Sequence, residues 1–158
     1  MTQQNQSNAD EASGDSRIAG GARTHKMLSR SFPAVAPSVA RIRAAVASYA
    51  VHMGAGQSLV EGVTLAVSEA ASNVVVHAYT AAGGMGLIHV EASVAGDELR
   101  VSVADAGPGL RPGGDGPGLG LGLVIIGELA DKVELLQVGT GGLRVLMRFA
   151  LPAAPISA

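Results

Sequence analysis

The sequence of 158 residues contains no cysteine and no tryptophan, and aromatic residues make up only 3% of it. The lack of cysteine excludes disulfide bonds and thiolate catalysis, and it argues against a zinc site. Because aromatic residues are so few, the core has to be built from Ala, Val, Leu and Ile in a chain that is 47% hydrophobic. This length and composition predict one folded domain with a hydrophobic core.

The chain also lacks a large excess of positive or negative charge, because the formal net charge is -2 and the pI is about 6.0. Only two lysines occur, Lys26 and Lys132, so no basic footprint for nucleic acid is indicated. The apolar runs are too short or too interrupted by glycine to span a bilayer. The N-terminus has no charged-then-apolar signal pattern. We therefore expect a soluble, cytoplasmic protein that binds neither nucleic acid nor a membrane.

Composition divides the chain into a domain and two tails. Residues 1–24 are small and polar, which predicts a disordered N-terminal tail. Residues 25–151 carry the periodic patterns of a single domain, and residues 152–158 form a short C-terminal tail.

The domain alternates between strand and helix patterns. Period-two alternation predicts strands over 25–32, 87–94, 98–105, 132–138 and 143–151, and helical spacing predicts helices over 38–53, 58–78 and 120–130. A turn at 95–97 joins two of the strands as a hairpin. Because strands pair as hairpins and helices group apart, we expect an α/β two-layer sandwich: a mixed, mostly antiparallel sheet with helices on one face.

The second predicted helix carries a line of polar residues. In residues 65–79, LAVSEAASNVVVHAY, the side chains of Glu69, Asn73 and His77 recur every four positions and share one face. The apolar residues around them predict a largely buried helix. Since a buried carboxylate needs partners, the line faces a hydrogen-bond network or a ligand cleft. Glu can act as a base, and Asn offers an oxygen to a hard cation such as Mg²⁺. Spacing alone leaves a solvent-facing stripe as the alternative.

An acidic residue ends the strand ELRVSVAD at 98–105. Period two places Asp105 on the same face as Leu99, Val101 and Val103. A carboxylate at a strand end on the core side is a candidate to accept a hydrogen bond from a ligand N–H. The alternative is an aspartate that only initiates the following turn.

The segment AGPGLRPGGDGPG at 106–118 predicts a loop, because it contains six glycines and three prolines. Gly118, Gly120 and Gly122 lead into the third helix and would expose backbone N–H groups to an anion such as a phosphate. A flexible linker is the alternative. The loop is not a Walker A loop, no G-x-G-x-x-G occurs, and protein-kinase signatures are missing.

Three motifs stand in order: SEAASNVVVHAY, VADAGPG and GLGLGLVIIGELAD. Together they resemble the GHKL ATPase superfamily, which includes gyrase, histidine kinases and mismatch-repair ATPases. They look most like its small single-domain branch, the anti-sigma-factor serine/threonine kinases. The resemblance covers about residues 28–150 and implies a Bergerat-type fold that binds ATP and Mg²⁺ between the helices and the sheet.

By motif position, the resemblance implies a role for each matching residue. Asn73 would ligate Mg²⁺, Glu69 would be the general base, and Asp105 would accept a hydrogen bond from the adenine amino group. Gly107 and Gly109 would line the adenine side of the pocket.

The phosphates would lie further along. Residues 110–117 would form the ATP lid, in which Arg111 is the one cation, and Gly118, Gly120 and Gly122 would contact phosphates. His77 is expected to order the helix end rather than to touch nucleotide.

The last hairpin departs from the family pattern. The family usually has G-G-T-x-V-x-M, where the Thr supports the adenine contact, whereas this chain has GGLRVLM with Leu143 in that position. Thr140 is nearby but displaced. Because leucine offers no hydrogen bond, a weaker hold on adenine is implied.

The resemblance implies a kinase that transfers the γ-phosphate of ATP to a serine or threonine of a STAS-type anti-sigma-factor antagonist. The same protein would bind a sigma factor and would form a homodimer through its N-terminal strand and first helix. Two alternatives are a non-catalytic regulator-binding module with a degenerate nucleotide site, and a nucleotide-binding relative in another signalling module. Intact Glu69 and Asn73 favour the kinase.

Overall fold

The computed structural model describes residues 26–78, 86–105, 119–139 and 141–152. Its elements follow the predicted order, with ends within a few residues of those expected. They are β1 (Leu28–Pro33), α1 (Ala36–His52), α2 (Gln57–Asn73), a π-helical turn η1 (Val74–Ala78), β2 (Leu87–Ala95), β3 (Glu98–Asp105), α3 (Leu119–Leu129), β4 (Lys132–Val138) and β5 (Gly142–Ala150). The predictions for both tails and for the loop at 106–118 fall outside the described residues.

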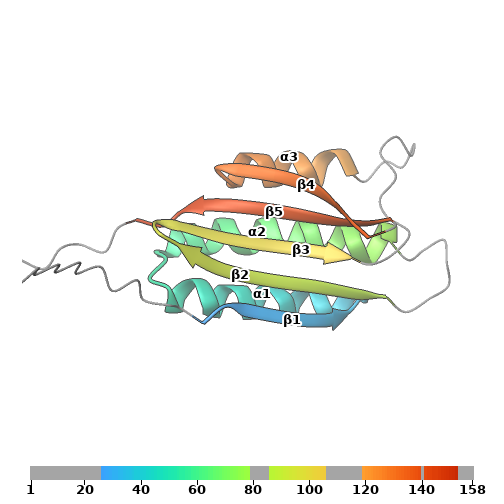
Figure 1. Cartoon of the computed structure of the whole chain (residues 1–158), viewed down its shortest axis with the longest axis horizontal. Helices are drawn as coiled ribbons and strands as arrows, with labels where there is room; N and C mark the ends of the chain where they lie inside the picture. Colours follow the sequence, from blue (N-terminus) through green and yellow to red (C-terminus); the bar gives the residue numbers. More distant parts are fainter. Residues whose placement is uncertain (1–25, 79–85, 106–118, 140, 153–158) are drawn as a thin grey trace, which may run out of the picture.

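The five strands form one sheet in the order β1-β2-β3-β5-β4. Every neighbouring pair is antiparallel, so the sheet is antiparallel throughout rather than mixed. Gly96, with φ 63°, makes the tight turn of the β2–β3 hairpin. Figure 1 shows the helices grouped on one side of the sheet, which confirms the predicted two-layer sandwich. β1 and β4 are the two edge strands.

The core lies between the helices and the inner face of the sheet. Alternate strand residues such as Val90, Val101 and Met147 are buried there, as period two requires. The outer face carries charged side chains instead, and cross-strand ion pairs such as Arg144–Glu91 at 3.1 Å join its strands. This division leaves the helix side as the place for a buried site.

α2 is the central helix, and it packs against α1 on one side and α3 on the other. Val63, Val67 and Ala70 are buried beneath it. The prediction that its apolar residues are buried nearly all round is wrong at two positions, because Leu65 and Val76 are exposed. Two helices and a sheet cover three sides of a central helix and leave an outward strip in solvent.

The expectation that every apolar run is too short to span a bilayer is wrong for Gln57–Val76, which meets the length and hydropathy limits of a membrane-spanning helix with a mean hydropathy of 1.4 over its apolar window. Its apolar character has another explanation here, because one side of the helix lies in the domain core. A core helix of a folded domain passes the same test.

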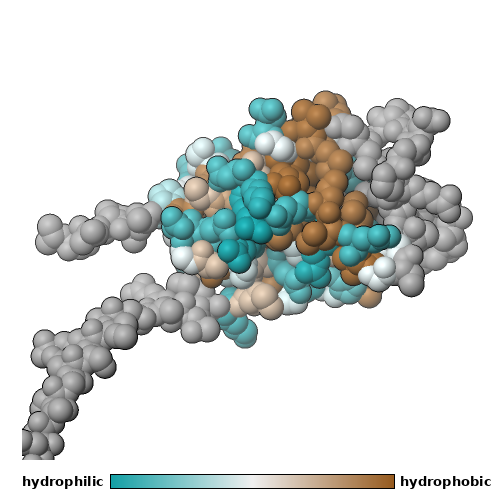
Figure 2. All heavy atoms as spheres, turned by 45° about the horizontal axis from the view of Figure 1, so that its top comes forward, coloured by the Kyte–Doolittle hydropathy of each residue, from teal (hydrophilic) through white to brown (hydrophobic). Residues whose placement is uncertain are grey.

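Hydrophobic side chains gather on the surface over α3 and β4, as Figure 2 shows. The exposed members are Leu121 and Val124 on α3 and Leu135 and Leu136 on β4, and Leu121 reaches 71% exposure. We refer to these four residues as the α3–β4 patch. Exposed apolar patches on folded domains commonly mark contacts with other proteins.

Candidate functional site

Glu69 and Asn73 lie next to one another on the side of α2 that faces α3. A Cβ atom placed on Gly122 would lie 3.1 Å from Asn73 Nδ2, 3.3 Å from Asn73 Oδ1 and 3.3 Å from Glu69 Oε2. Both polar side chains are half-buried. They therefore face another element rather than form a stripe in open solvent, and Gly122 permits the close approach because it has no side chain.

The polar line changes geometry immediately after Asn73. The next residues, Val74–Ala78, wind as a π-helical turn that includes His77. π-Helical turns are rare, and they occur frequently at functional sites. Because the winding changes, the four-residue spacing no longer keeps His77 in line with Glu69 and Asn73. The side chain of His77 lies outside the described part of the chain, so its predicted role stays a prediction.

Asp105 ends β3 on the inner face of the sheet. Its exposure is only 1%, and Leu99, Val101 and Val103 on the same face are also buried, as the alternation predicts. An aspartate that only initiates a turn would keep its carboxylate in water. Removing a carboxylate from water is costly unless polar groups meet it, so this position fits a binding role better than a turn.

Gly142 packs directly against the backbone of Asp105. A Cβ atom on Gly142 would lie 2.3 Å from the Asp105 carbonyl oxygen and 3.0 Å from that of Val138. Such distances exclude every other residue type unless the backbone moves. The predicted strands at 132–138 and 143–151 leave Gly142 between them, and the paired glycines before the second strand are the one signal in the sequence of this contact.

Leu143 follows on β5, in the position where the family pattern has Thr. It lies two residues before the buried Val145 and therefore shares the inner face of the sheet with it. Because Ala104 pairs with Arg144, Leu143 is also next to the end of β3 where Asp105 lies. The departure from the family pattern thus falls within the candidate site, not at its margin.

These residues meet at one end of the molecule. Figure 1 shows the C-terminal ends of α2 and β3 at the same end as the N-terminal ends of α3 and β5. Gly120 and Gly122 lie in the first turns of α3, and their contact with phosphates stays a prediction. Gly107, Gly109 and Gly118 lie outside the described residues, and the same holds for Arg111 and Thr140.

The donor atoms present fit a magnesium ion shared with phosphates. Within the described ranges, no group of three or more His, Cys, Asp or Glu side chains could hold a metal. Mg²⁺ in nucleotide sites needs no such cluster, because one or two protein oxygens and the phosphate oxygens complete its shell. The amide oxygen of Asn73 supplies that kind of oxygen beside α3, next to the Glu69 carboxylate.

Comparison with known proteins points to one family. A model of the histidine kinase-like ATPase domain matches residues 32–149. The serine-protein kinase RsbW of Bacillus cereus (strain Q1) is 32% identical in an alignment of 130 positions, and the match covers 73% of this chain and 79% of that protein. RsbW of Halalkalibacterium halodurans is 33% identical over 121 residues, covering 66% of this chain and 72% of that protein.

Two solved structures resemble the fold. The structure of the RsbU and RsbW domains of Rv1364c from Mycobacterium tuberculosis has a TM-score of 0.64 and 26% identity. It covers 84% of this chain, which spans only 35% of that longer chain. The histidine kinase domain of the blue-light activated kinase EL346 from Erythrobacter litoralis has a TM-score of 0.52 and 26% identity, covering 85% of this chain and 67% of that one.

Proposed function

The chain belongs to the histidine kinase-like ATPase family, and on that premise we propose that it binds ATP with Mg²⁺ where α2, α3, β3 and β5 meet. The family is an ATPase domain, which implies ATP binding. The observation that carries the proposal is the close approach of the Glu69 and Asn73 side chains to Gly122 at the start of α3, where even a Cβ atom would crowd them. An acid and an amide beside a glycine-led helix N-terminus suit a triphosphate and its cation.

Adenine recognition is assigned to Asp105. Its carboxylate accepts a hydrogen bond from the exocyclic amino group, which is a donor in adenine. Its burial supports this role, because a hydrogen bond to a charged group is worth more away from water, about 1.5–3 kcal/mol. Gly142 keeps the β5 backbone close to Asp105 and so fixes the strand end that carries the carboxylate.

Phosphate binding is assigned to Asn73 and the N-terminus of α3. The Asn73 oxygen would hold Mg²⁺, and the free N–H groups of the first α3 turn would donate to phosphate oxygens. When bound, the metal neutralises charge on the β- and γ-phosphates. Gly122 supports this assignment because its missing side chain leaves the helix start within reach of Asn73.

Phosphoryl transfer follows from the position of Glu69 beside Asn73. The hydroxyl oxygen of a serine or threonine attacks the γ-phosphorus, and the hydroxyl proton passes to the Glu69 carboxylate. The bond from the γ-phosphorus to the bridging oxygen breaks, and ADP leaves with that electron pair. A positioned base of this kind contributes a factor of about 10²–10⁴.

The acceptor we propose is a protein, a STAS-type anti-sigma-factor antagonist, and a sigma factor is the second partner. Similarity to serine-protein kinases named RsbW supports a protein acceptor. The α3–β4 patch offers further support, because Leu121 directly precedes Gly122 and an apolar surface therefore borders the site. A homodimer through β1 and α1 and a cytoplasmic location remain predictions, and sedimentation at micromolar concentration tests the dimer.

A second candidate is a non-catalytic module that binds a regulator through the same surface. Leu143 is the observation that favours it, because leucine replaces a hydrogen-bonding residue beside Asp105. In that case nucleotide binding would be weak and no phosphate would be transferred.

Incubation with γ-labelled ATP, Mg²⁺ and purified STAS-domain proteins separates the two candidates. If the chain is a kinase, labelled phosphate should appear on a serine or threonine of one of these STAS-domain proteins. The substitution Glu69→Gln should remove this label while ATP still binds. A protein that binds such a partner tightly but leaves it unlabelled would support the non-catalytic module.

A further inference from the structure

The outer side of α3 is apolar. Leu121 and Val124 are three positions apart and therefore neighbours on the helix surface, and their exposed fractions are 71% and 58%. Ile126, on the side toward the core, is fully buried. No charged residue occurs in α3 before Glu128. Because a surface helix normally carries polar side chains on its outer side, this side of α3 is suited to a contact with another molecule.

β4 continues this apolar surface round the edge of the sheet. Leu135 pairs with Val145, a buried residue of the inner face, and therefore lies on the helix side of the sheet. Leu136 pairs with Arg144 and lies on the outer side. Both leucines are exposed, at 49% and 44%. In the described sheet β4 pairs only with β5, and charged side chains usually protect such a free edge, so two successive leucines there indicate a contact surface.

The basic side chains of β4 and β5 are paired with acids. Arg144 binds Glu91 at 3.1 Å. Lys132 and Arg148 bind Glu134 at 2.8 and 2.9 Å. A partner therefore meets the α3–β4 patch mainly through apolar contacts and not through unpaired basic groups of these strands.

The rest of this sequence offers little that would cover the patch. Outside the described ranges the large apolar residues are few and scattered: Met1, Ile18, Tyr79, Met85, Leu110 and Ile156. No two of these six lie within five positions of each other, so no such segment matches four clustered side chains. We therefore expect the patch to contact a different molecule.

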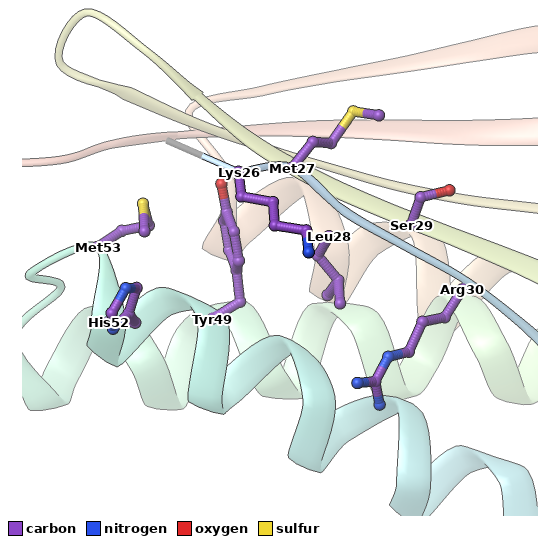
Figure 3. Close-up of a pocket in the computed structure, with 8 residues that line it drawn as sticks. All are labelled: Lys26, Met27, Leu28, Ser29, Arg30, Tyr49, His52 and Met53. Carbon is purple, nitrogen blue, oxygen red and sulfur yellow. The ribbon is translucent and has the colours of Figure 1, made fainter. Parts of the chain in front are cut away.

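A second copy of the chain has its predicted place at the opposite edge of the sheet, on β1 and α1. A hollow of about 650 Å³ lies between these two elements, and Figure 3 shows Leu28 and Arg30 of β1 directed toward α1. Because β1 and β4 are the two ends of the strand order, a copy bound at β1 leaves the α3–β4 patch uncovered.

The place of the patch beside the ATP site identifies its partner. Leu121 directly precedes Gly122, which the Asn73 and Glu69 side chains approach closely. If Glu69 takes the proton of the acceptor hydroxyl, that hydroxyl has to come within hydrogen-bond reach of Glu69. The body of the acceptor then lies over the start of α3, where the patch begins.

Building on the proposed kinase activity, we propose that the α3–β4 patch is the docking surface for the acceptor protein. The acceptor presents an apolar surface next to its reacting hydroxyl. This surface contacts Leu121 and Val124 on α3 and continues over Leu135 and Leu136 at the β4 edge. Contacts of this kind hold the acceptor equally before and during phosphoryl transfer, so they set its affinity and not the rate of the chemical step.

The test measures phosphotransfer by the full chain, with saturating ATP–Mg²⁺ and a STAS-domain protein that the wild type labels. Val124→Gln, Leu135→Gln and Leu136→Gln should each raise KM for the acceptor roughly three- to tenfold, because about half of each side chain is exposed and would be buried by the acceptor. The triple variant should raise KM at least about thirtyfold. The value of kcat at saturating acceptor and the ATP affinity should not change.

Two control variants separate docking from other effects. Leu87→Gln makes the same change at a leucine that is 46% exposed and lies on the same outer side of the sheet as Leu136. Because β3 and β5 lie between β2 and β4, this variant should leave KM unchanged. Leu135→Met keeps an apolar side chain of similar volume and should hold KM within about twofold of the wild type.

Four results would overturn the docking surface. A wild-type KM in the triple variant would remove it and leave the kinase activity intact, and weaker sigma-factor binding in that variant would assign the patch to the sigma factor. A matching loss of ATP affinity would show that the three side chains support the ATP site instead of contacting the acceptor. A wild-type dimer that the triple variant dissociates in sedimentation would assign the patch to a second copy. If the wild type labels no STAS-domain protein, the proposed function fails, and the patch has no acceptor to bind.

Discussion

Replacing Gly122 by alanine tests the site with a single methyl group. The new Cβ would lie 3.1 Å from Asn73 Nδ2 and 3.3 Å from both Asn73 Oδ1 and Glu69 Oε2. Ordinary contacts of a carbon atom begin near 3.5 Å, so these side chains have to move by a few tenths of an ångström. A movement of this size should have little effect on the stability of the fold. It should have a large effect on ligand binding, because Glu69 and Asn73 have to hold the ligand in one geometry.

The effects on stability and on binding should therefore diverge. Alanine favours a helix over glycine by about 0.5–1 kcal/mol, which offsets the crowding, so the free energy of unfolding of Gly122→Ala should change by less than about 1 kcal/mol. ATP–Mg²⁺ affinity should fall at least about tenfold, because the loss of one charge-assisted interaction costs about 1.5–3 kcal/mol.

The assay is calorimetric titration with ATP–Mg²⁺, paired with thermal unfolding. Gly127→Ala in the same helix is the matched control, because a Cβ there meets nothing within 4 Å. It should raise the melting temperature by roughly 2–6 °C and leave ATP affinity unchanged. Wild-type affinity in Gly122→Ala, or an equal loss in Gly127→Ala, would refute the placement of phosphates at the start of α3.

Four other substitutions give separate outcomes. In the wild type, EDTA should weaken ATP binding because it removes Mg²⁺. In Asn73→Ala, ATP affinity should be low and equal with and without EDTA, as titration under both conditions would measure. Glu69→Gln should keep ATP binding and slow phosphotransfer by about 10²–10⁴ in a single-turnover assay. The hydrogen bond from Lys132 is the largest cause that lowers the pKa of Glu134 below its ordinary value of 4.5. The ionised Glu134 therefore stabilises the fold at higher pH, and this contribution is lost as pH falls through the lowered pKa. In Glu134→Gln the free energy of unfolding should depend less steeply on pH in the acid range. Burial raises the pKa of Tyr49 above 10.0, so stability should fall as pH rises past 10 in the wild type but not in Tyr49→Phe.

The strands and the position of Asp105 could be predicted because period two is a local property. Alternation along ELRVSVAD is sufficient to place Asp105 on the buried face, and the structure confirms this. The pairing of Glu69 with Asn73 on one helix face was predictable for the same reason. Neither prediction depended on which elements pack against the strand or the helix.

Features that depend on packing partners could not be predicted in this way. Leu65 and Val76 are exposed because of where α1 and α3 lie around α2, and no local pattern shows that. The contact of Gly142 with Asp105 depends on β5 lying beside β3, which is a pairing between segments far apart in sequence. The π-helical turn after Asn73 has no distinctive residue within VVVHA.

The most direct test of the central claim is the preference of the wild-type chain for ATP over GTP, measured by titration with each nucleotide and Mg²⁺. Adenine presents an amino donor where guanine presents a carbonyl acceptor, and the Asp105 carboxylate can only accept. The account predicts that ATP binds at least about tenfold more tightly than GTP, and that Asp105→Asn loses most of this preference. Equal binding of ATP and GTP, or an unchanged preference in Asp105→Asn, would contradict it.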